Sequence, residues 1–236
     1  MTRRPKRFYS AVSVDGVAPT LRVLLDGKPM RTPGKRELAL PARPLAEAVA
    51  AEWEAQGEHI DPGTMPLTRL VNSALDGVAG REAEVRADIG KYAASDLVCY
   101  RAEGSVELER RQADAWDPIL AWARETLGVH LLTGRGIVPV VQPQAAVAAI
   151  ESALARLDAF ALTAHHVMTT LMGSAVLALA HARGRLTAEE AWVAAHVDED
   201  WQISQWGEDA DAGARRERRC AEMQAASRLL QLLAGD

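Results

Sequence analysis

The spacing of apolar residues changes after about the first sixty positions. Phe8–Val14 and Leu21–Leu25 are short, rich in valine and aromatic residues and partly alternating, and an Asp-Gly pair follows each of them. Alternation with such turn residues predicts antiparallel β-strands joined by tight turns. A further short strand is expected around residues 37–40. The chain therefore begins with a small sheet.

A helix is expected to pack on this sheet. Pro44 suits the first turn of a helix, and Gly57 suits the position just after its end. Between them Leu45, Val49 and Trp53 recur at four-residue intervals and share one face. We expect Trp53 to be a structural residue, largely buried between this helix and the rest of the fold.

Beyond Asp61-Pro62-Gly63 the apolar residues follow a period near 3.6, which indicates helices. Thr187 and Glu190 form a capping-box pair at the start of one of them. The expected helices are residues 66–75, 81–95, 107–126, 143–157, 160–182, 188–206 and 210–233. The predicted fold class is α+β: a small N-terminal α+β domain with antiparallel strands at residues 1–62, followed by a larger, mostly α-helical domain at residues 63–236.

The stretch Phe160–Ala182 contains no Asp, Glu, Lys or Arg and is long enough to cross a bilayer. It also contains His165, His166 and His181, several threonines and a glycine. A helix that is apolar all round can instead form the centre of a large domain. We expect a buried central helix and no stable membrane insertion.

The composition is that of an ordinary globular protein: 236 residues, 25% of them charged, with a formal net charge of -5. A nucleic-acid partner is not expected, because nucleic-acid binding favours a basic face. Cys99 and Cys220 match no metal or redox spacing, which favours a reducing compartment. Met1–Arg7 is basic but leads into no apolar signal segment. We expect a bacterial cytoplasmic protein.

No catalytic signature is present. Gly134-Arg135-Gly136 lacks the third glycine of a dinucleotide loop, and no serine lies in a nucleophile elbow. Neighbouring His and Asp residues give at most two metal ligands. We therefore expect no catalytic residue, no metal, no cofactor and no enzymatic activity. The alternative is a small-molecule hydrolase or transferase in which Glu199 and His196, three residues apart, act as acid and base.

The expected helix at residues 188–206 has two apolar arcs when its residues are placed about 100° apart. Trp192, Ile203 and Trp206 form one arc, and Glu199 lies within it. A carboxylate among apolar groups is costly unless it is paired. Either Glu199 forms a salt bridge inside this chain, or it is kept for a cation or amide of a partner. The pattern alone leaves both open.

Several segments of the chain carry distinctive motifs. The most specific is the run Asp198–Gly207, with the sequence DEDWQISQWG. The others are Leu25–Pro33, Ala48–Gln56 with Glu52-Trp53, Met65–Leu70, Asp96–Arg101, Trp116–Pro118 and Gly184–Thr187. In their order and spacing these segments together resemble a known family, the mitochondrial and alphaproteobacterial assembly chaperones that bind the α subunit of the F-type ATP synthase. The last thirty residues carry no motif of this family.

The resemblance implies a chaperone that binds the unassembled α subunit, prevents its aggregation and is displaced by the β subunit, without nucleotide or metal. It implies a functionally sensitive acidic position within Asp198–Asp200. The arrangement of residues around the expected helix favours Glu199, which lies within an apolar arc. The expected partner contacts are Trp192, Glu199, Asp200, Ile203, Gln205 and Trp206. Eukaryotic relatives are expected in the mitochondrial matrix.

Overall fold

A computed structural model describes residues 4–235 of the chain. The contacts divide it into two units. Unit 1 comprises Met1–Glu82, Asp158–Ala164 and Ala225–Asp236, and unit 2 comprises Ala83–Leu157 and His165–Gln224. Each unit is described by itself. The domain boundary expected near residue 62 stays a prediction.

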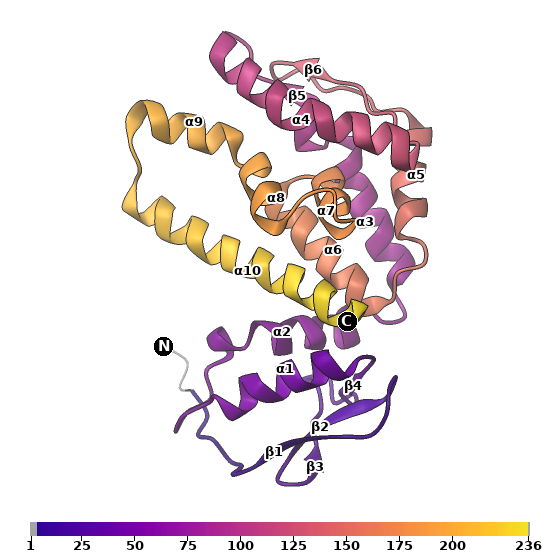
Figure 1. Ribbon diagram of the computed structural model, residues 1–236, viewed down its shortest axis with the longest axis vertical. Helices are drawn as coiled ribbons and strands as arrows, with labels where there is room; N and C mark the ends of the chain where they lie inside the picture. Colours follow the sequence, from indigo (N-terminus) through magenta and orange to yellow (C-terminus); the bar gives the residue numbers. More distant parts are fainter. Residues whose placement is uncertain (1–3, 236) are drawn as a thin grey trace. The chain divides into compact units, whose positions relative to one another are not determined.

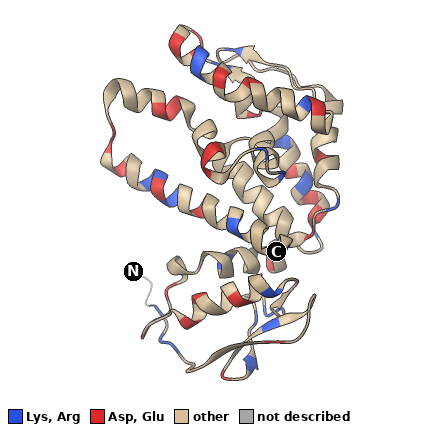
Figure 2. Cartoon of the chain, viewed as in Figure 1, with Lys and Arg blue, Asp and Glu red and all other residues tan. Residues whose placement is uncertain are grey.

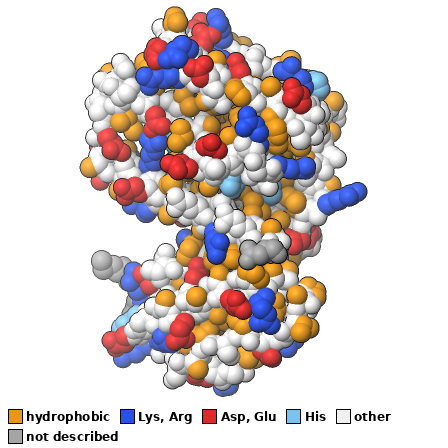
Figure 3. Space-filling model, in the orientation of Figure 1, with side chains coloured by type: hydrophobic (Ala, Val, Ile, Leu, Met, Phe, Trp, Pro, Cys, Tyr) orange, Lys and Arg blue, Asp and Glu red, His pale blue; other side chains and the backbone are white. Residues whose placement is uncertain are grey.

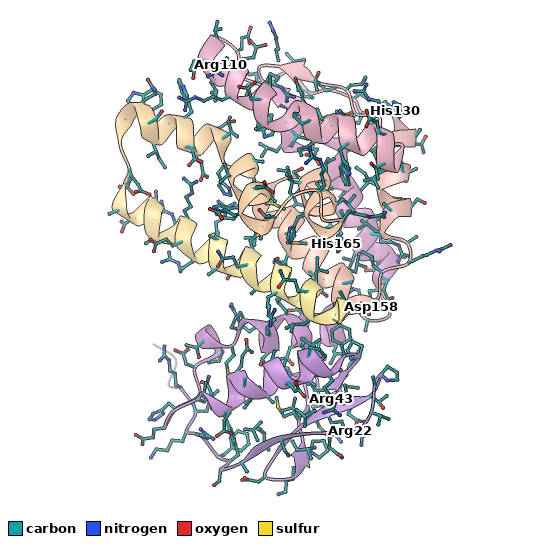
Figure 4. All side chains as sticks on the ribbon, viewed as in Figure 1. Arg22, Arg43, Arg110, His130, Asp158 and His165 are labelled. Atoms are coloured by element: carbon teal, nitrogen blue, oxygen red, sulfur yellow. The ribbon has the colours of Figure 1, made fainter. Side chains whose placement is uncertain are left out.

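Unit 1 contains a small antiparallel sheet (Figure 1). Its strands are β1 (Val12–Asp15), β2 (Leu21–Leu25), β3 (Lys28–Pro29) and β4 (Ala39–Leu40). β2 pairs with all three other strands. Leu21, Val23 and Leu25 of β2 are buried, whereas Arg22, labelled in Figure 4, is exposed and forms an ion pair with Glu37. The alternation that predicted a half-buried strand is present.

Helix α1 (Arg43–Glu54) packs against β1 and β2. Leu45 and Val49 of its inner face are fully buried. Trp53 is half-buried, and its structural role stays a prediction. It lies at the last turn of α1, where Tyr9 covers it with ring centroids 5.6 Å apart. Its Nε1 is nevertheless buried and has no hydrogen-bond partner among residues 4–235.

The next elements of unit 1 are the short 3₁₀ turn η1 (Pro62–Thr64), helix α2 (Pro66–Ser73) and the π-helical turn η2 (Ala74–Val78). Glu52 of α1 accepts hydrogen bonds from the backbone N–H groups of Leu67 and Thr68 at 2.7 and 2.8 Å. A carboxylate there satisfies two otherwise unpaired donors at the start of α2 and favours its dipole. This contact gives the Glu52 motif a structural role.

Unit 2 is mainly helical (Figure 1). Its elements, some of which extend into unit 1, are α3 (Glu82–Ala94), η3 (Leu97–Cys99), β5 (Tyr100–Arg101), α4 (Val106–Leu127), β6 (Gly134–Arg135), α5 (Gln144–Leu154), α6 (Ala159–Met172), α7 (Ala175–Ala182), α8 (Ala188–Ala195), α9 (Val197–Trp206) and α10 (Ala210–Ala234). β5 and β6 form a two-stranded parallel sheet. The predicted α+β fold class is confirmed.

The expected helix at residues 160–182 is in fact two helices, α6 and α7. They are separated at Gly173, whose φ of 67° lies in the left-handed region that ends helices. Ser174 then caps α7 by accepting a hydrogen bond from the N–H of Leu177 at 3.0 Å. Among residues 4–235, none of the helices has both the length and the apolar character that a membrane span needs.

The expected helix at residues 188–206 is also two helices, α8 and α9. His196 breaks it, because its Nδ1 lies 2.7 Å from the carbonyl oxygen of Trp192. The side chain thus occupies the acceptor that its own backbone N–H would use in a continuous helix. The N–H of His196 bonds instead to the carbonyl of Val193, at 3.1 Å. The two apolar arcs expected from placing residues 188–206 on one continuous helix therefore do not apply.

Candidate functional site

The candidate site lies in unit 2, where α9 and α10 form a helical hairpin joined by residues 207–209 (Figure 1). A groove of about 530 Å³ runs between them. On α9 it is lined by Glu199, Gln202, Ile203 and Trp206. On α10 it is lined by Ala212, Gly213, Arg215, Arg216 and Arg219. Each helix thus contributes residues at the i, i+3, i+4, i+7 spacing of one helical face.

The structure brings three of the predicted contact residues to this groove: Glu199, Ile203 and Trp206. Trp192 does not join them. It lies on α8, before the break, and is 7% exposed, with its ring centroid 3.8 Å from that of His196 and the two planes tilted by 34°. Gln205 is exposed but does not line the groove.

The three acidic residues at the start of α9 make different contacts. Such residues favour the positive end of the helix dipole. Asp198 accepts a hydrogen bond from the Gln112 side chain at 2.7 Å, and Asp200 pairs with Arg216 of α10 at 2.5 Å. Glu199 is 3.9 Å from the nearest nitrogens of both Arg219 and His196. Charge of both signs therefore meets along the facing sides of α9 and α10 (Figure 2).

Glu199 is the least constrained of these carboxylates. Its side chain is 48% exposed, and its ion-pair distances exceed hydrogen-bond length. The apolar surroundings expected from the wheel are only partly present, because Ile203 is half-buried and Trp206 is exposed. Asp200, not Glu199, forms the tight salt bridge inside the chain. Glu199 therefore retains capacity to accept hydrogen bonds.

Trp206 is the most exposed aromatic residue of α9, with 73% of its surface accessible. Its ring meets that of Trp201 edge to face, with centroids 5.5 Å apart and planes at 89°. Such pairs hold an aromatic side chain in a defined orientation. The groove thus has an apolar end supported by a second tryptophan.

His196 lies beneath this surface. It is 3% exposed, and burial lowers its pKa below the usual range, with Arg216 and Arg219 acting in the same direction. The neutral ring donates its Nδ1–H to the carbonyl of Trp192, so Nε2 faces Glu199 without a proton. His196 does not line the groove. Glu199 and His196 therefore do not converge on a shared pocket.

The arginines of α10 are functional candidates that the sequence reasoning missed. Arg215, Arg216 and Arg219 lie in the last thirty residues, which carry no recognised motif. Their i, i+1, i+4 spacing places them near one face of a helix, and this was the available signal. Their position opposite the acidic start of α9 depends on tertiary structure.

Other motifs of the sequence hold the fold together. Arg101 is 8% exposed, donates to the carbonyl of Val98 at 2.6 Å, and pairs with Asp117 at 2.6 Å. Its guanidinium also stacks 5.0 Å from the Trp116 ring, whose Nε1–H donates to the carbonyl of Ala194 at 2.7 Å. These motifs position α4 against the end of α8. The α9 motif presents Glu199, Ile203 and Trp206 at the groove between α9 and α10.

A second hollow of about 470 Å³ is lined by Tyr100, Arg101, Glu103, Gln112 and Asp198, among others. Acidic and basic side chains are interspersed with hydrophobic ones on the face shown in Figure 3. Throughout the described range 4–235, no group of three or more His, Cys, Asp or Glu side chains is arranged to hold a metal ion.

Comparison with known proteins identifies the family. The model of the ATP12 chaperone protein matches residues 6–124. The crystal structure of Atp12 from Paracoccus denitrificans is 41% identical and superimposes with a TM-score of 0.92, covering 97% of this chain and 98% of that one. A mutant of the same protein gives the same values.

A second protein, Atu1473 from Agrobacterium tumefaciens, is 47% identical with a TM-score of 0.93, over 97% of this chain and 86% of that one. At 97% coverage these matches include α9 and most of α10, which lie beyond the segment covered by the family model. It follows that the chain belongs to the ATP12 chaperone family, the family of ATP synthase assembly chaperones that its motifs resemble.

Proposed function

We propose that this chaperone binds the unassembled α subunit of the F-type ATP synthase, prevents its aggregation and is displaced by the β subunit. The contact surface comprises the groove between α9 and α10 and the exposed side of α9. Glu199, Asp200, Ile203, Gln205 and Trp206 contact the partner. Trp192 supports this surface from below through the contact of its ring with that of His196.

One observation carries the proposal: the family motif on α9 presents exposed groups at a groove. Trp206 is 73% exposed and Glu199 is 48% exposed. Selection for stability alone would bury the tryptophan or replace it with a polar residue. Exposed aromatic residues beside charged groups are typical of protein-binding sites.

The size of the groove suits reversible binding. A subunit awaiting assembly exposes apolar interface that promotes aggregation, so it needs a temporary cover. A chaperone that is displaced by another subunit must bind less tightly than that subunit does. A groove of about 530 Å³ with one exposed tryptophan offers a limited anchor. Release then needs no nucleotide.

The arrangement supports a chaperone over the hydrolase or transferase alternative. An acid–base pair must converge on the reacting atoms of a substrate. Glu199 lines the groove, but His196 is buried below it with one nitrogen bonded to the backbone. Neither residue is therefore placed for joint proton transfer.

The test is an aggregation assay on isolated α subunit. The full chain, added in equal amount, is expected to keep the α subunit in solution and to elute with it as a complex. Adding β subunit is expected to release the chaperone and leave an α–β assembly. An unrelated aggregating protein is the control and should not be protected. Failure to protect the α subunit, or equal protection of the unrelated protein, contradicts the proposal.

A further inference from the structure

The arginines that line the groove differ in their hydrogen-bond and ion-pair partners. Arg216 is neutralised by Asp200, at 2.5 Å. Arg219 donates to the carbonyl of Leu171 at 2.5 Å and lies 3.9 Å from Glu199. Arg215 lines the same groove yet makes no hydrogen bond or ion pair with the residues at positions 4–235. Its guanidinium is available.

The other carboxylates that line the groove do not pair with the Arg215 guanidinium. Asp209 accepts a hydrogen bond from the N–H of Ala212 at 2.8 Å and so caps the start of α10. Glu208 lies beside Gly213, where its Oε1 is 2.9 Å from the place that a Cβ would take. Both carboxylates therefore remain at the first turn of α10.

The charges of the groove favour one class of occupant. The lining includes three acidic and three basic side chains and is therefore balanced in charge: Glu199, Glu208 and Asp209 with Arg215, Arg216 and Arg219. A polyanion such as nucleic acid or an acidic membrane surface needs an excess of positive charge. A balanced lining with an apolar end suits a protein segment that carries its own mixture of charged and apolar side chains.

We propose that Arg215 binds a carboxylate of the client, so that the groove takes a segment in which an acidic side chain lies beside an apolar one. The guanidinium forms two parallel hydrogen bonds to a carboxylate, which fixes the register of the segment. The apolar side chain packs on Ile203 and Trp206. This inference rests on the proposed function, since it takes the α subunit as the client.

The neighbouring arginine gives a matched control. Arg218 lies on the same helix and is exposed, and it too makes no ion pair with any described residue. Unlike Arg215, it does not line the groove. Arg215→Glu and Arg218→Glu therefore change the net charge equally and differ only in position. Arg215→Gln removes the cation without adding a carboxylate beside Glu199.

The experiment measures the affinity of the full-length variants for isolated α subunit. Arg215→Glu and Arg215→Gln are expected to weaken binding roughly tenfold or more, the loss of a charge-assisted contact. Arg218→Glu is expected to stay within about twofold of the wild type, since an exposed charge outside the contact contributes little. Short overlapping peptides of the α subunit, tested on the same proteins, are expected to locate a segment that requires Arg215 and contains an Asp or Glu.

The outcomes separate the two proposals. If the wild type does not bind α subunit, the proposed function fails and this inference fails with it. If the wild type binds and the Arg215 and Arg218 variants lose affinity equally, binding depends on overall charge and the inference alone is overturned. Unchanged affinity in the Arg215 variants also overturns it. So does self-association of the wild type that Arg215→Glu abolishes, since a second copy then occupies the groove.

Discussion

Gln112 and Asp198 join α4 to the start of α9. The side-chain N–H of Gln112 donates to Asp198 at 2.7 Å, and its Oε1 accepts the N–H of Ala102 at 2.6 Å. Gln112 is 2% exposed, whereas Ala102 and Asp198 are half-buried, so both bonds are partly shielded from water. The amide side chain of one α4 residue therefore connects the segment that follows β5 to α9, the helix that carries Glu199 and Trp206.

Replacing Gln112 with Leu should destabilise the protein and loosen α9. The substitution keeps much of the volume but leaves two hydrogen-bonding groups without this partner, at a cost of about 1–3 kcal/mol in the free energy of unfolding. Chemical denaturation followed by circular dichroism gives this value. Affinity for α subunit should fall as well, since α9 loses an anchor.

A pair of substitutions at Asp198 provides the control. Asp198→Asn keeps an oxygen that accepts from Gln112 and should cost less than Asp198→Ala, which removes the acceptor. Equal stability of Gln112→Leu and the wild type would show that this connection does not position α9.

Asp96 gives a prediction about pH. It is fully buried and accepts hydrogen bonds from the backbone N–H groups of Val98 at 3.2 Å and Val176 at 3.1 Å. Burial raises the pKa of Asp96 from 3.8 to about 6, although these bonds and one with Ser174 act in the opposite direction. The folded protein therefore holds this proton to higher pH than the unfolded chain does.

An acid with a raised pKa in the folded state contributes stability below its unfolded pKa, and the contribution is lost as the pH rises through the folded value. Relative to Asp96→Asn, the wild type should lose about 3 kcal/mol of unfolding free energy between about pH 4 and pH 7. Denaturation of both proteins across this range measures the difference. A wild type that instead gained stability relative to Asp96→Asn as the pH rose would mean that the hydrogen bonds outweigh burial and lower the pKa.

Substitutions at Trp53 distinguish the contribution of ring packing to stability from that of the polar N–H group of the indole. Trp53→Phe keeps an aromatic ring beside Tyr9 and removes the Nε1–H that has no partner within residues 4–235, so stability should change by less than about 1 kcal/mol. Trp53→Arg places a charge in a half-buried site and should cost about 2–4 kcal/mol. The Tyr9 hydroxyl donates a hydrogen bond to the backbone carbonyl of Trp53. Because this bond does not involve the indole, both variants keep it.

Soluble yield and thermal unfolding measure these effects. Trp206→Arg is the matched comparison, because Trp206 is 73% exposed. It should keep the wild-type melting temperature while weakening the binding of α subunit. A Trp53→Arg protein as stable as the wild type would show that Trp53 has no structural role.

Local patterns predicted the elements that local contacts determine. The alternation of Leu21, Val23 and Leu25 matched a half-buried strand, and the Thr187–Glu190 capping box forms with bonds of 3.1 and 2.7 Å. Both features depend on residues close in sequence. The family motifs likewise pointed to the correct family because their spacing is that of the fold.

The errors arose where a single side chain or a distant segment decides the outcome. The apolar period continues through His196, so the sequence indicated one helix, but the bond of His196 to the Trp192 carbonyl ends α8. That break removes Trp192 from the face of Trp206. The partners of the α9 carboxylates lie across the hairpin on α10, and no pattern within α9 predicts the pairing of Asp200 with Arg216.

Glu199 provides the most direct test of the proposed contact. Glu199→Lys reverses the charge at a side chain that is 48% exposed and 3.9 Å from its nearest cations. Because these ion pairs are loose, their loss should cost at most about 1 kcal/mol of stability. Affinity for the α subunit should fall by about 2–5 kcal/mol, since a charge-assisted bond is replaced by repulsion.

Glu125→Lys is the matched control for Glu199→Lys. Glu125 is exposed on α4, forms no ion pair with any residue the structure describes, and does not line the groove. Both variants should keep the wild-type melting curve, and only Glu199→Lys should fail to suppress aggregation of isolated α subunit. Unfolding of Glu199→Lys would instead assign the carboxylate to the internal network with Arg219 and His196. A stable Glu199→Lys protein that still protects the α subunit would exclude both roles, because neither the fold nor the client would then depend on the charge at this position.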